Sequence, residues 1–282
     1  MVTIVSGRRE HLVNQHRALS SSVTLPHCYI VVAMNEPTAH EWLPRVPPYA
    51  ETVTVTTLDK RLPLAAARNL GAQRAIEESA EVLVFLDVDC VPTAELITAY
   101  ATAAGQHPDA LLGGAVGYLP EGVGAFDANR MSVARFHEFR PRLADGDIAP
   151  ADPNLFWSLS FATTAETWKT SGGFHEMYRG YGGEDTDFAL SAQQANVPFL
   201  WVGGAEALHQ YHSTESPPVR HLDDILDNGR LFARRWGYWP MSGWLEAFHA
   251  LGLVARDART GGWAKVGASV GPDAAPRKGV DQ

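Results

Sequence analysis

Hydrophobic and polar positions alternate in a regular order over the first 90 residues. Four runs rich in apolar or β-branched residues predict strands: residues 3–5, 27–34, 52–57 and 81–86. The run at 27–34 has no polar alternation, which is typical of a strand buried on both faces of a sheet. Helix-forming residues fill 10–19 and 64–80 between these runs. Alternating strands and helices predict an α/β fold with a doubly wound, mostly parallel sheet of Rossmann type and right-handed crossovers.

The pattern beyond residue 110 is less regular. Strands are predicted at 111–118, 155–163 and 199–202, and helices at 185–195, 219–236 and 242–255. Residues 120–153 read as a loop-and-helix insertion whose role the pattern does not define. After about residue 260 the chain turns to Gly, Ala, Pro and Lys, which favours disorder.

This pattern predicts three parts of the chain. Residues 1–215 form the main α/β domain, with a first half at about 1–118 and a second half at about 119–215. Residues 216–258 form a C-terminal helical extension, and 259–282 a disordered tail.

Composition narrows the classes of function. The 282 residues are 45% hydrophobic, enough for a full core. With 32 acidic and 23 basic residues the net charge is −9, and such a chain is a poor nucleic-acid binder because phosphate neutralisation needs clustered cations.

Cysteine usage and hydropathy bear on the compartment. Cys28 and Cys90 lie in apolar runs without a CxxC partner, so we expect no disulfide framework. The first residues lack the features of a signal peptide, and no apolar stretch approaches ~18 residues. We therefore expect a cytoplasmic protein without a membrane span.

Two carboxylates follow the last apolar run of the first half, at Asp87 and Asp89. In open α/β sheets, ligands bind beyond the carboxyl ends of the strands. Oxygen ligands at such an end suit Mg²⁺ or Mn²⁺, which bridge phosphate oxygens. An Asp-rich turn without a ligand is the alternative.

A glycine-rich approach leads into three acids at a predicted helix start. Gly172-Gly173-Phe174 is followed by Gly180-Tyr181-Gly182-Gly183-Glu184-Asp185-Thr186-Asp187. Acids there gain from the helix dipole, which is the structural explanation. Three acids after so many glycines favour a carboxylate presented to a ligand.

A third candidate is the histidine pair His209 and His212, with Tyr211 between them. Imidazole is a plausible further ligand for Mn²⁺ beside carboxylates. A structural role for these histidines remains an equal alternative.

Together these segments resemble GT-A glycosyltransferases of family 2. Residues 85–92 resemble the DxD segment of that fold, 8–12 the nucleotide-contacting turn, and 67–71 the segment beneath the donor. Residues 172–187 resemble the GGED signature of the β-1,4-galactosyltransferases (family 7) and their bacterial relatives. The likeness covers roughly residues 1–255 in the expected order. It implies that residues 1–215 are a GT-A catalytic domain, with a nucleotide-binding half at about 1–118 and an acceptor-side half at about 119–215.

For the metal and donor, the resemblance implies roles for particular residues. Asp89, His212 and Asp87 would form the site for Mn²⁺ or Mg²⁺, with His209 as second choice. Asp87 would contact the ribose or a metal-bound water. The residues implied in donor binding, besides Asp87 and Asp89, are Arg8 at the diphosphate, Arg68 and Asn69 at the nucleotide, Tyr181 stacking on a sugar, and Gly183.

For the reaction, the resemblance implies that Asp185 is the general base and that Glu184 hydrogen-bonds donor or acceptor. The implied activity is metal-dependent, inverting transfer of a sugar from a nucleotide-sugar donor to a hydroxyl of a saccharide or other acceptor. UDP-galactose is the leading expectation for the donor.

Departures from the galactosyltransferase pattern leave the donor sugar and the acceptor open. Arg179-Gly180-Tyr181 stands where the eukaryotic enzymes carry Trp-Gly-Trp, and Thr186 interrupts the run of acids. Ser6-Gly7 replaces the Pro-aromatic pair after the first strand.

Two other classes of function were weighed. A sugar nucleotidyltransferase is disfavoured because residues 5–9 lack the GxGTRxxP opening. A non-catalytic carbohydrate- or nucleotide-binding protein on the same frame would draw on the tryptophans for sugar stacking. The presence of metal and base candidates favours the enzyme.

Overall fold

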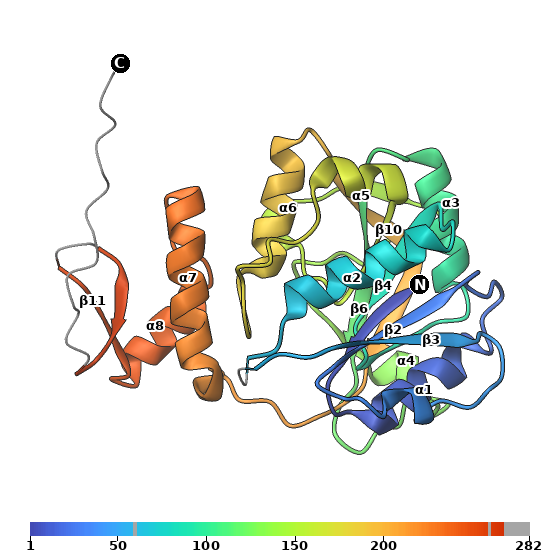
Figure 1. Ribbon diagram of the computed structural model, residues 1–282, viewed down its shortest axis with the longest axis horizontal. Helices are drawn as coiled ribbons and strands as arrows, with labels where there is room; N and C mark the ends of the chain where they lie inside the picture. The colour runs from blue at the N-terminus through green and yellow to red at the C-terminus, as the bar shows by residue number, and fades with distance from the viewer. Residues whose placement is uncertain (59–60, 259–260, 268–282) are drawn as a thin grey trace. The chain divides into compact units, whose positions relative to one another are not determined.

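A computed structural model describes residues 1–58, 61–258 and 261–267 of the chain. These residues divide into two compact units, Met1–Ser213 and Thr214–Gln282. Each unit is described by itself (Figure 1).

The first unit holds ten strands: β1 Val2–Val5, β2 Tyr29–Met34, β3 Ala50–Val55, β4 Val82–Leu86, β5 Cys90–Pro92, β6 Leu111–Tyr118, β7 Arg135–Phe136, β8 Ile148–Pro150, β9 Ser160–Thr164 and β10 Phe199–His209. Its helices are α1 Arg9–Leu19, α2 Leu64–Glu77, α3 Leu96–Gln106, α4 Arg130–Val133, α5 Ala165–Ser171 and α6 Glu184–Gln194. Two short 3-10 turns lie at Ala39–Glu41 and Pro153–Leu155.

The strands form one twisted sheet in the order β3-β2-β1-β4-β9-β6-β10-β5, with β7 beside β6 and β8 beside β10. Strands β3, β2, β1 and β4 run parallel, and β10 runs parallel to β6. Strand β9 is antiparallel to both β4 and β6, and β5 is antiparallel to β10. This mixed, mostly parallel α/β sheet confirms the predicted fold class.

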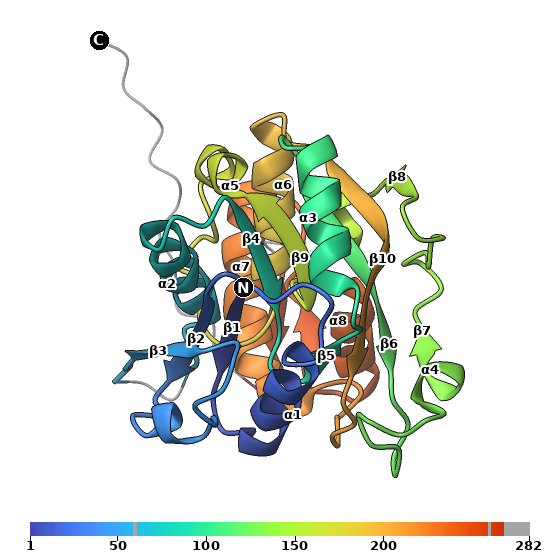
Figure 2. The same cartoon turned by 90° about the vertical axis from the view of Figure 1, so that its right-hand side faces the viewer.

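Helices cover both faces of the sheet, as the uninterrupted apolar strands require. Helices α1 and α3 bury leucines, alanines and a tyrosine against one face. Helices α2, α5 and α6 cover the other, where an aromatic cluster fills the space between helices and strands. Figure 2 views the sheet from the side of α1 and α3. The carboxyl ends of β1, β4 and β6 are thereby left open to ligands.

The main departures from the predicted elements lie in the second half. Strand β10 was predicted to end at residue 202, but it continues to His209. The register against β6 shifts between Val202 and Ala207, and Gly204 has a φ of 82°. The glycine pair therefore marks a β-bulge rather than the strand's end. Helices α3 and α5 and strand β5 were not predicted.

The second unit is small. A 3-10 turn at Val219–His221 leads into α7 Leu222–Trp236, and α8 Ser242–Ala250 precedes a hairpin of β11 Val254–Arg256 and β12 Trp263–Lys265. The predicted helix over 242–255 therefore ends early. Strand β12 contradicts the disorder predicted from residue 259, because Trp263 is buried in this unit's core. The remainder of that tail, 259–260 and 268–282, lies outside the described residues.

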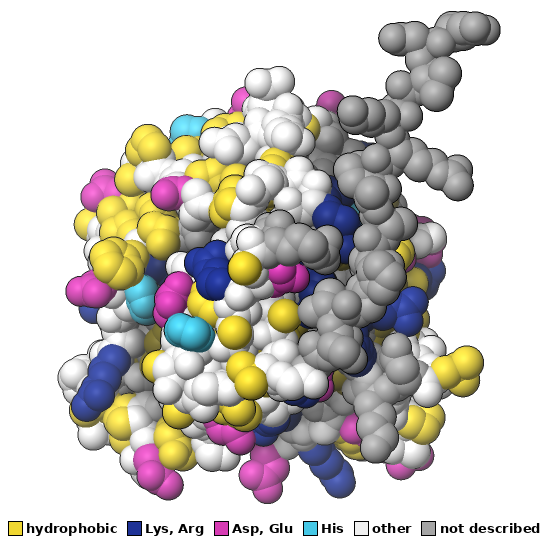
Figure 3. Space-filling view, turned by 90° about the vertical axis from the view of Figure 1, so that its left-hand side faces the viewer, with side chains coloured by type: hydrophobic (Ala, Val, Ile, Leu, Met, Phe, Trp, Pro, Cys, Tyr) yellow, Lys and Arg dark blue, Asp and Glu magenta, His cyan; other side chains and the backbone are white. Residues whose placement is uncertain are grey.

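Two surface properties follow from these elements. In the described part of the chain, each helix is too short or too polar to cross a bilayer. Among the described side chains drawn in Figure 3, lysines and arginines are dispersed among acidic and hydrophobic groups.

Candidate active site

The turn that carries the two aspartates is held from below by a buried glutamine. Asp87 follows β4, and the backbone N–H of Cys90 donates a hydrogen bond to the Asp87 carbonyl at 2.8 Å, which closes a turn. The Gln15 amide on α1 donates to the carbonyls of Asp87 and Cys90 at 2.8 and 2.9 Å. The Tyr29 hydroxyl donates to Gln15 in turn. Since Gln15 is fully buried, this clamp fixes the direction in which Asp89 leaves the sheet.

Strand β10 brings two histidines beside Asp89. The register pairs His209 with Cys90 across β10 and β5, and the backbone N–H of Gln210 donates to the Asp89 carbonyl at 2.7 Å. Asp89 Oδ2 lies 3.6 Å from His209 Nε2 and 3.4 Å from His212 Nε2. Ligand atoms of the three residues lie within 4.8 Å of one another. One carboxylate and two imidazoles form a donor set that suits Mn²⁺.

The protonation states of this group fit a cation. Burial opposes ionisation of Asp89, but the hydrogen bond from His212 and the positive charges of His209 and Arg8 outweigh it and lower the pKa of Asp89 to about 2. Burial also lowers the pKa of His209 more than the Asp89 charge raises it. An ionised carboxylate and a neutral imidazole are the forms that bind a metal. Both candidate histidines therefore belong to one group with Asp89.

Asp87 faces a different partner. Arg68 on α2 donates from Nη2 to Asp87 Oδ1 at 3.0 Å, and its Nη1 lies 3.7 Å from Glu184 Oε1. Arg68 is buried and also packs its guanidinium over Phe174, 5.3 Å from the ring centroid. Burial raises the pKa of Asp87 to about 6 even though the Arg68 charge lowers it. Arg68 thus joins the aspartate turn to the acids at the start of α6.

Glycines shape the approach to α6. Gly180, Gly182 and Gly183 have φ values of 70°, 102° and 91°, a region that strongly favours glycine. The Gly182 N–H donates to Glu184 Oε2 at 3.2 Å. The glycine-rich segment therefore turns the chain so that Glu184 points into the protein, where it is 5% exposed.

The Glu184 carboxyl is neutral over much of the physiological range. Burial, followed by the charge of Asp185, raises the pKa of Glu184 to about 8, against the lowering effect of Arg68. A neutral carboxyl can donate a hydrogen bond as well as accept one. Glu184 is therefore suited to bind a sugar hydroxyl.

This raised pKa predicts a pH-dependent difference in stability. The carboxyl's contribution is fully present below its unfolded value of 4.5 and is lost as the pH rises through about 8. Glu184→Gln removes that loss, so the variant should gain stability relative to wild type between pH 5 and 8, by at most about 1.4 kcal/mol per pH unit. Urea unfolding in EDTA measures the difference.

The exposed Glu121→Gln is the matched control, for which a difference independent of pH is expected. If the free energies of unfolding of Glu184→Gln and wild type differ by the same amount at every pH from 5 to 8, the assignment of a neutral Glu184 is contradicted.

Asp185 is held by the corner that precedes β9. Ser158 donates to its carboxylate twice, from the backbone N–H to Oδ2 and from the hydroxyl to Oδ1, each at 3.1 Å. Ser158 is buried, whereas Asp185 is partly exposed. Two hydrogen bonds to different oxygens fix the plane of the carboxylate, and the exposed side remains open to a substrate.

Asn69 was predicted to hold the nucleotide, but its amide has other partners. Its Nδ2 donates to the Phe174 carbonyl at 2.8 Å and to Glu176 Oε1 at 2.9 Å, and its Oδ1 accepts the Phe174 N–H at 2.8 Å. A Cβ on Gly173 would lie 2.8 Å from that same Oδ1. Asn69 thus secures the loop that leads to the acids. Its predicted contact with a nucleotide stays a prediction.

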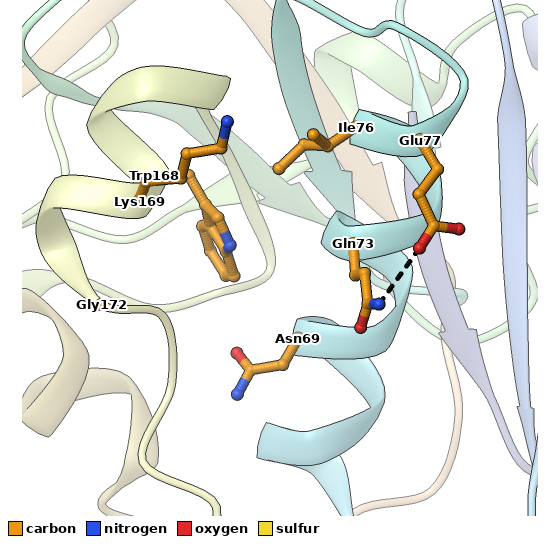
Figure 4. A pocket seen from close by; sticks show the side chains of 7 residues that line it. All are labelled: Asn69, Gln73, Ile76, Glu77, Trp168, Lys169 and Gly172. Atoms are coloured by element: carbon orange, nitrogen blue, oxygen red, sulfur yellow. Dashed lines mark hydrogen bonds between the residues drawn. The ribbon is translucent and has the colours of Figure 1, made fainter.

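A shallow groove of about 370 Å³ lies beside Asn69, between α2 and α5. Figure 4 shows Gln73 and Glu77 of α2 on one side of the groove and Trp168 and Lys169 of α5 on the other. Asn69 stands at its lower end. Gln73 therefore offers a control position on the same helix as Asn69.

Asn69→Ala is expected to lower the free energy of unfolding by about 1–3 kcal/mol, because it leaves two buried backbone groups of Phe174 without partners. Gln73→Ala, one turn further along α2, should change it by less than about 0.5 kcal/mol. Urea unfolding measures both. Equal losses in the free energy of unfolding for the two variants would contradict the stabilising role of the hydrogen bonds between Asn69 and Phe174.

The remaining predicted residues also lie in this region. Arg8 Nη1 is 3.6 Å from Asp89 Oδ2, and Arg8 adopts a left-handed φ of 52° at the start of α1. Tyr181 is 40% exposed, and the charges of Asp185 and Glu184 add to burial in raising its pKa. Gly183 is the first residue before α6. The structure brings these residues together, and their individual roles remain predictions.

Several residues of the site were missed in the sequence. Gln15, Ser158 and Gln210 act through backbone hydrogen bonds, which leave no motif. His11 on α1 packs edge-on against His212 with ring centroids 6.2 Å apart. His11 lies four residues before Gln15, so both are on the same face of α1. This spacing could have identified His11 as a site residue if α1 had been predicted to pack against the aspartate turn.

Comparison with known proteins places this site in a family. Residues 21–165, more than half of the chain, match the family described as Glycosyl transferase family 2. A search of the curated proteins finds no match.

Solved structures with a similar fold include GalNAc-T7 with UDP, GalNAc and Mn²⁺, at a TM-score of 0.55 and 15% identity over 75% of this chain and 43% of that one. S. aureus TarS 1–349 matches with a TM-score of 0.55 and 14% identity, over 82% of this chain and 63% of that one. The same TarS fragment in complex with UDP-GlcNAc matches with a TM-score of 0.55 and 13% identity, over 82% of this chain and 64% of that one.

This chain thus spans about 43–64% of the length of these proteins. Identities this low show the fold alone. The closer relation to β-1,4-galactosyltransferases stays a prediction. On the match over residues 21–165, together with the open carboxyl ends of the sheet and the acids gathered there, the chain belongs to glycosyl transferase family 2.

Proposed function

We propose that this protein transfers a sugar from a nucleoside diphosphate donor, UDP-linked, to an acceptor hydroxyl with inversion at the anomeric carbon, and that it depends on a divalent metal. UDP-galactose is the leading donor. Two structural neighbours, one solved with UDP and one with UDP-GlcNAc, support a UDP-linked donor.

One observation carries the proposal: Arg68 contacts Asp87 on one side and Glu184 on the other. Arg68 thereby joins the turn that carries Asp89 to the helix start that carries Asp185, which supports one shared site for a cation and a carboxylate. A nucleoside diphosphate leaves with negative charge, and an acceptor hydroxyl must lose a proton. A site that combines a place for a cation with a separate carboxylate meets both needs.

The metal would be held by Asp89, His209 and His212, and it would offset the charge that develops on the departing diphosphate. Arg8, 3.6 Å from Asp89, would contact the same diphosphate. Asp87, tied to Arg68, would face the ribose. These groups bind and orient the donor.

On the acceptor side, Asp185 would take the proton of the attacking hydroxyl as the bond to the anomeric carbon forms. The Ser158 hydrogen bonds hold its carboxylate in one plane. Neutral Glu184 would hydrogen-bond a sugar hydroxyl, and the partly exposed Tyr181 would stack on a sugar ring. Attack opposite to departure gives a single inverting displacement.

The test measures nucleoside diphosphate released from a panel of nucleotide sugars in Mn²⁺, with saccharide acceptors and with water alone. Release from one donor, with a product of opposite anomeric configuration by NMR, is the expected result. Pyrophosphate release from a sugar phosphate and a nucleoside triphosphate would instead support a nucleotidyltransferase. The absence of any release would contradict the proposal.

A further inference from the structure

Arg140 is a buried guanidinium with few partners, and it lies within the insertion at 120–153 whose role the sequence left undefined. The residue is 4% exposed, and its Nε and Nη1 atoms have no hydrogen-bond partner. Its Nη2 makes one long hydrogen bond, 3.4 Å, to the Gly114 carbonyl on β6. Within the described ranges no carboxylate lies at ion-pair distance from it. Burying an unpaired charge carries a large desolvation cost, which something nearby must offset.

Two tryptophans offset part of that cost. The Arg140 guanidinium carbon lies 5.0 Å from the ring centroid of Trp157 and 5.1 Å from that of Trp201. The backbone N–H of Arg140 donates to the His137 carbonyl, and the His137 ring packs edge-on against Trp157 at 4.8 Å. Cation–π contacts strengthen when the charge is desolvated. The insertion is therefore anchored to Trp157 through both Arg140 and His137.

The corner at residues 157–159 connects this anchor to the site. Trp157 contacts Arg140, Ser158 donates twice to Asp185, and the Leu159 carbonyl accepts the Asp87 N–H at 2.9 Å. Displacement of Trp157 would therefore move the two hydrogen bonds that orient Asp185. Burial lowers the pKa of Arg140, and neighbouring groups that include Asp185 raise it.

From this arrangement we infer that Arg140 is a positioning residue for Asp185: it fixes the Trp157–Ser158 corner, whose two hydrogen bonds hold the Asp185 carboxylate in place. The inference rests on the proposed function, because the placement of Asp185 matters to turnover only if Asp185 accepts a proton. It also gives the insertion at 120–153 a role in the reaction.

The other charged or titratable groups that act on Asp185 come from four elements: Glu184 of α6, Arg68 of α2, Asp87 after β4, and Tyr181 of the glycine-rich loop. Arg68 and Arg140 attract the ionised carboxylate, whereas Asp87 repels it. Arg68 is already in contact with two other carboxylates. Arg140, by contrast, has no ion-pair partner among the described residues, and its guanidinium contacts Gly114, Trp157 and Trp201.

The test compares Arg140→Met with Arg140→Lys in the full chain. Nucleoside diphosphate release in Mn²⁺ is measured against pH, and donor affinity by calorimetry. For Arg140→Met we expect kcat to fall about tenfold or more across the pH profile, with donor Kd unchanged, because Asp185 is displaced while the donor contacts are kept. Arg140→Lys should retain more of the wild-type kcat because its ammonium can still pack against Trp157.

The control is Arg142→Met, which removes a partly exposed arginine of the same insertion that pairs with Glu206. It should leave the profile unchanged. If Arg140→Met does not fold, Ser158→Ala tests the same corner, and it should also lower kcat at constant donor Kd because it removes one hydrogen bond to Asp185.

Two outcomes oppose the inference, and they are distinguishable. Wild-type enzyme that releases nucleoside diphosphate, together with an Arg140→Met profile and kcat like wild type, would overturn the role of Arg140 alone. Normal kcat and pH profile in Ser158→Ala would do the same for the corner. Wild-type protein that releases no nucleoside diphosphate from any donor would overturn the proposed function and this inference with it.

Discussion

Asp185→Asn is expected to lower the turnover number by about two to four orders of magnitude while donor affinity stays close to that of wild type. An amide of the same shape can accept the Ser158 backbone N–H at its oxygen and donate from its nitrogen to the Ser158 hydroxyl, but it cannot take a proton from an acceptor hydroxyl. The effect should therefore fall on kcat and kcat/KM alike, as it does when an interaction made only in the transition state is lost.

The measurement is steady-state transfer with the best donor of the panel, beside calorimetric donor titration. Asp109→Asn, an exposed aspartate that the proposed chemistry does not use, is the matched control and should transfer at the wild-type rate. Near-normal turnover in Asp185→Asn would remove the general-base assignment without affecting the metal site.

Removal of the metal is expected to have a comparable effect. EDTA should abolish transfer, and added Mn²⁺ should restore it, because the charge of the departing diphosphate is otherwise uncompensated. Asp89→Asn should bind Mn²⁺ at least about a hundredfold more weakly, since Asp89 is the charged ligand of the group and its pKa is held to about 2.

His209→Ala and His212→Ala test the two imidazoles in the same titration. Both should weaken Mn²⁺ binding, because each nitrogen lies within 3.6 Å of Asp89 Oδ2. The exposed His27→Ala serves as the control. Transfer that continues undiminished in EDTA, or Mn²⁺ affinity unchanged in Asp89→Asn, would exclude this group as the metal site.

Much of the fold could be predicted because its signals are local. Uninterrupted apolar runs identified β2 and β4, and the Ala-rich stretch after Pro63 identified α2. Strand β10 was underestimated because Gly203 and Gly204 resemble a strand end, whereas pairing with β6 resumes beyond them. Its continuation is a property of the neighbouring strand and has no local signal.

The candidate site shows the same limit. Asp87, Asp89, Glu184 and Asp185 were identified because carboxylates at strand and helix ends are visible in a sequence. His209 was ranked below His212, since nothing in the spacing shows that β10 pairs with β5 and sets His209 beside Asp89.

Positioning residues were harder to predict. Gln15, Ser158 and Arg140 act through partners that are distant in the chain, with Gln15 and Asp87 separated by 72 positions. A buried glutamine or arginine has no characteristic pattern in the sequence. Only the folded chain shows that Arg140 lies between two tryptophans.

The most direct test of the central claim is calorimetric titration of UDP-galactose and a panel of other nucleotide sugars into the protein, first with Mn²⁺ and then with EDTA. The account predicts that one donor binds with Mn²⁺ and that EDTA abolishes the binding. Failure of every nucleotide to bind the folded, Mn²⁺-loaded protein, or equal binding in EDTA, would contradict it.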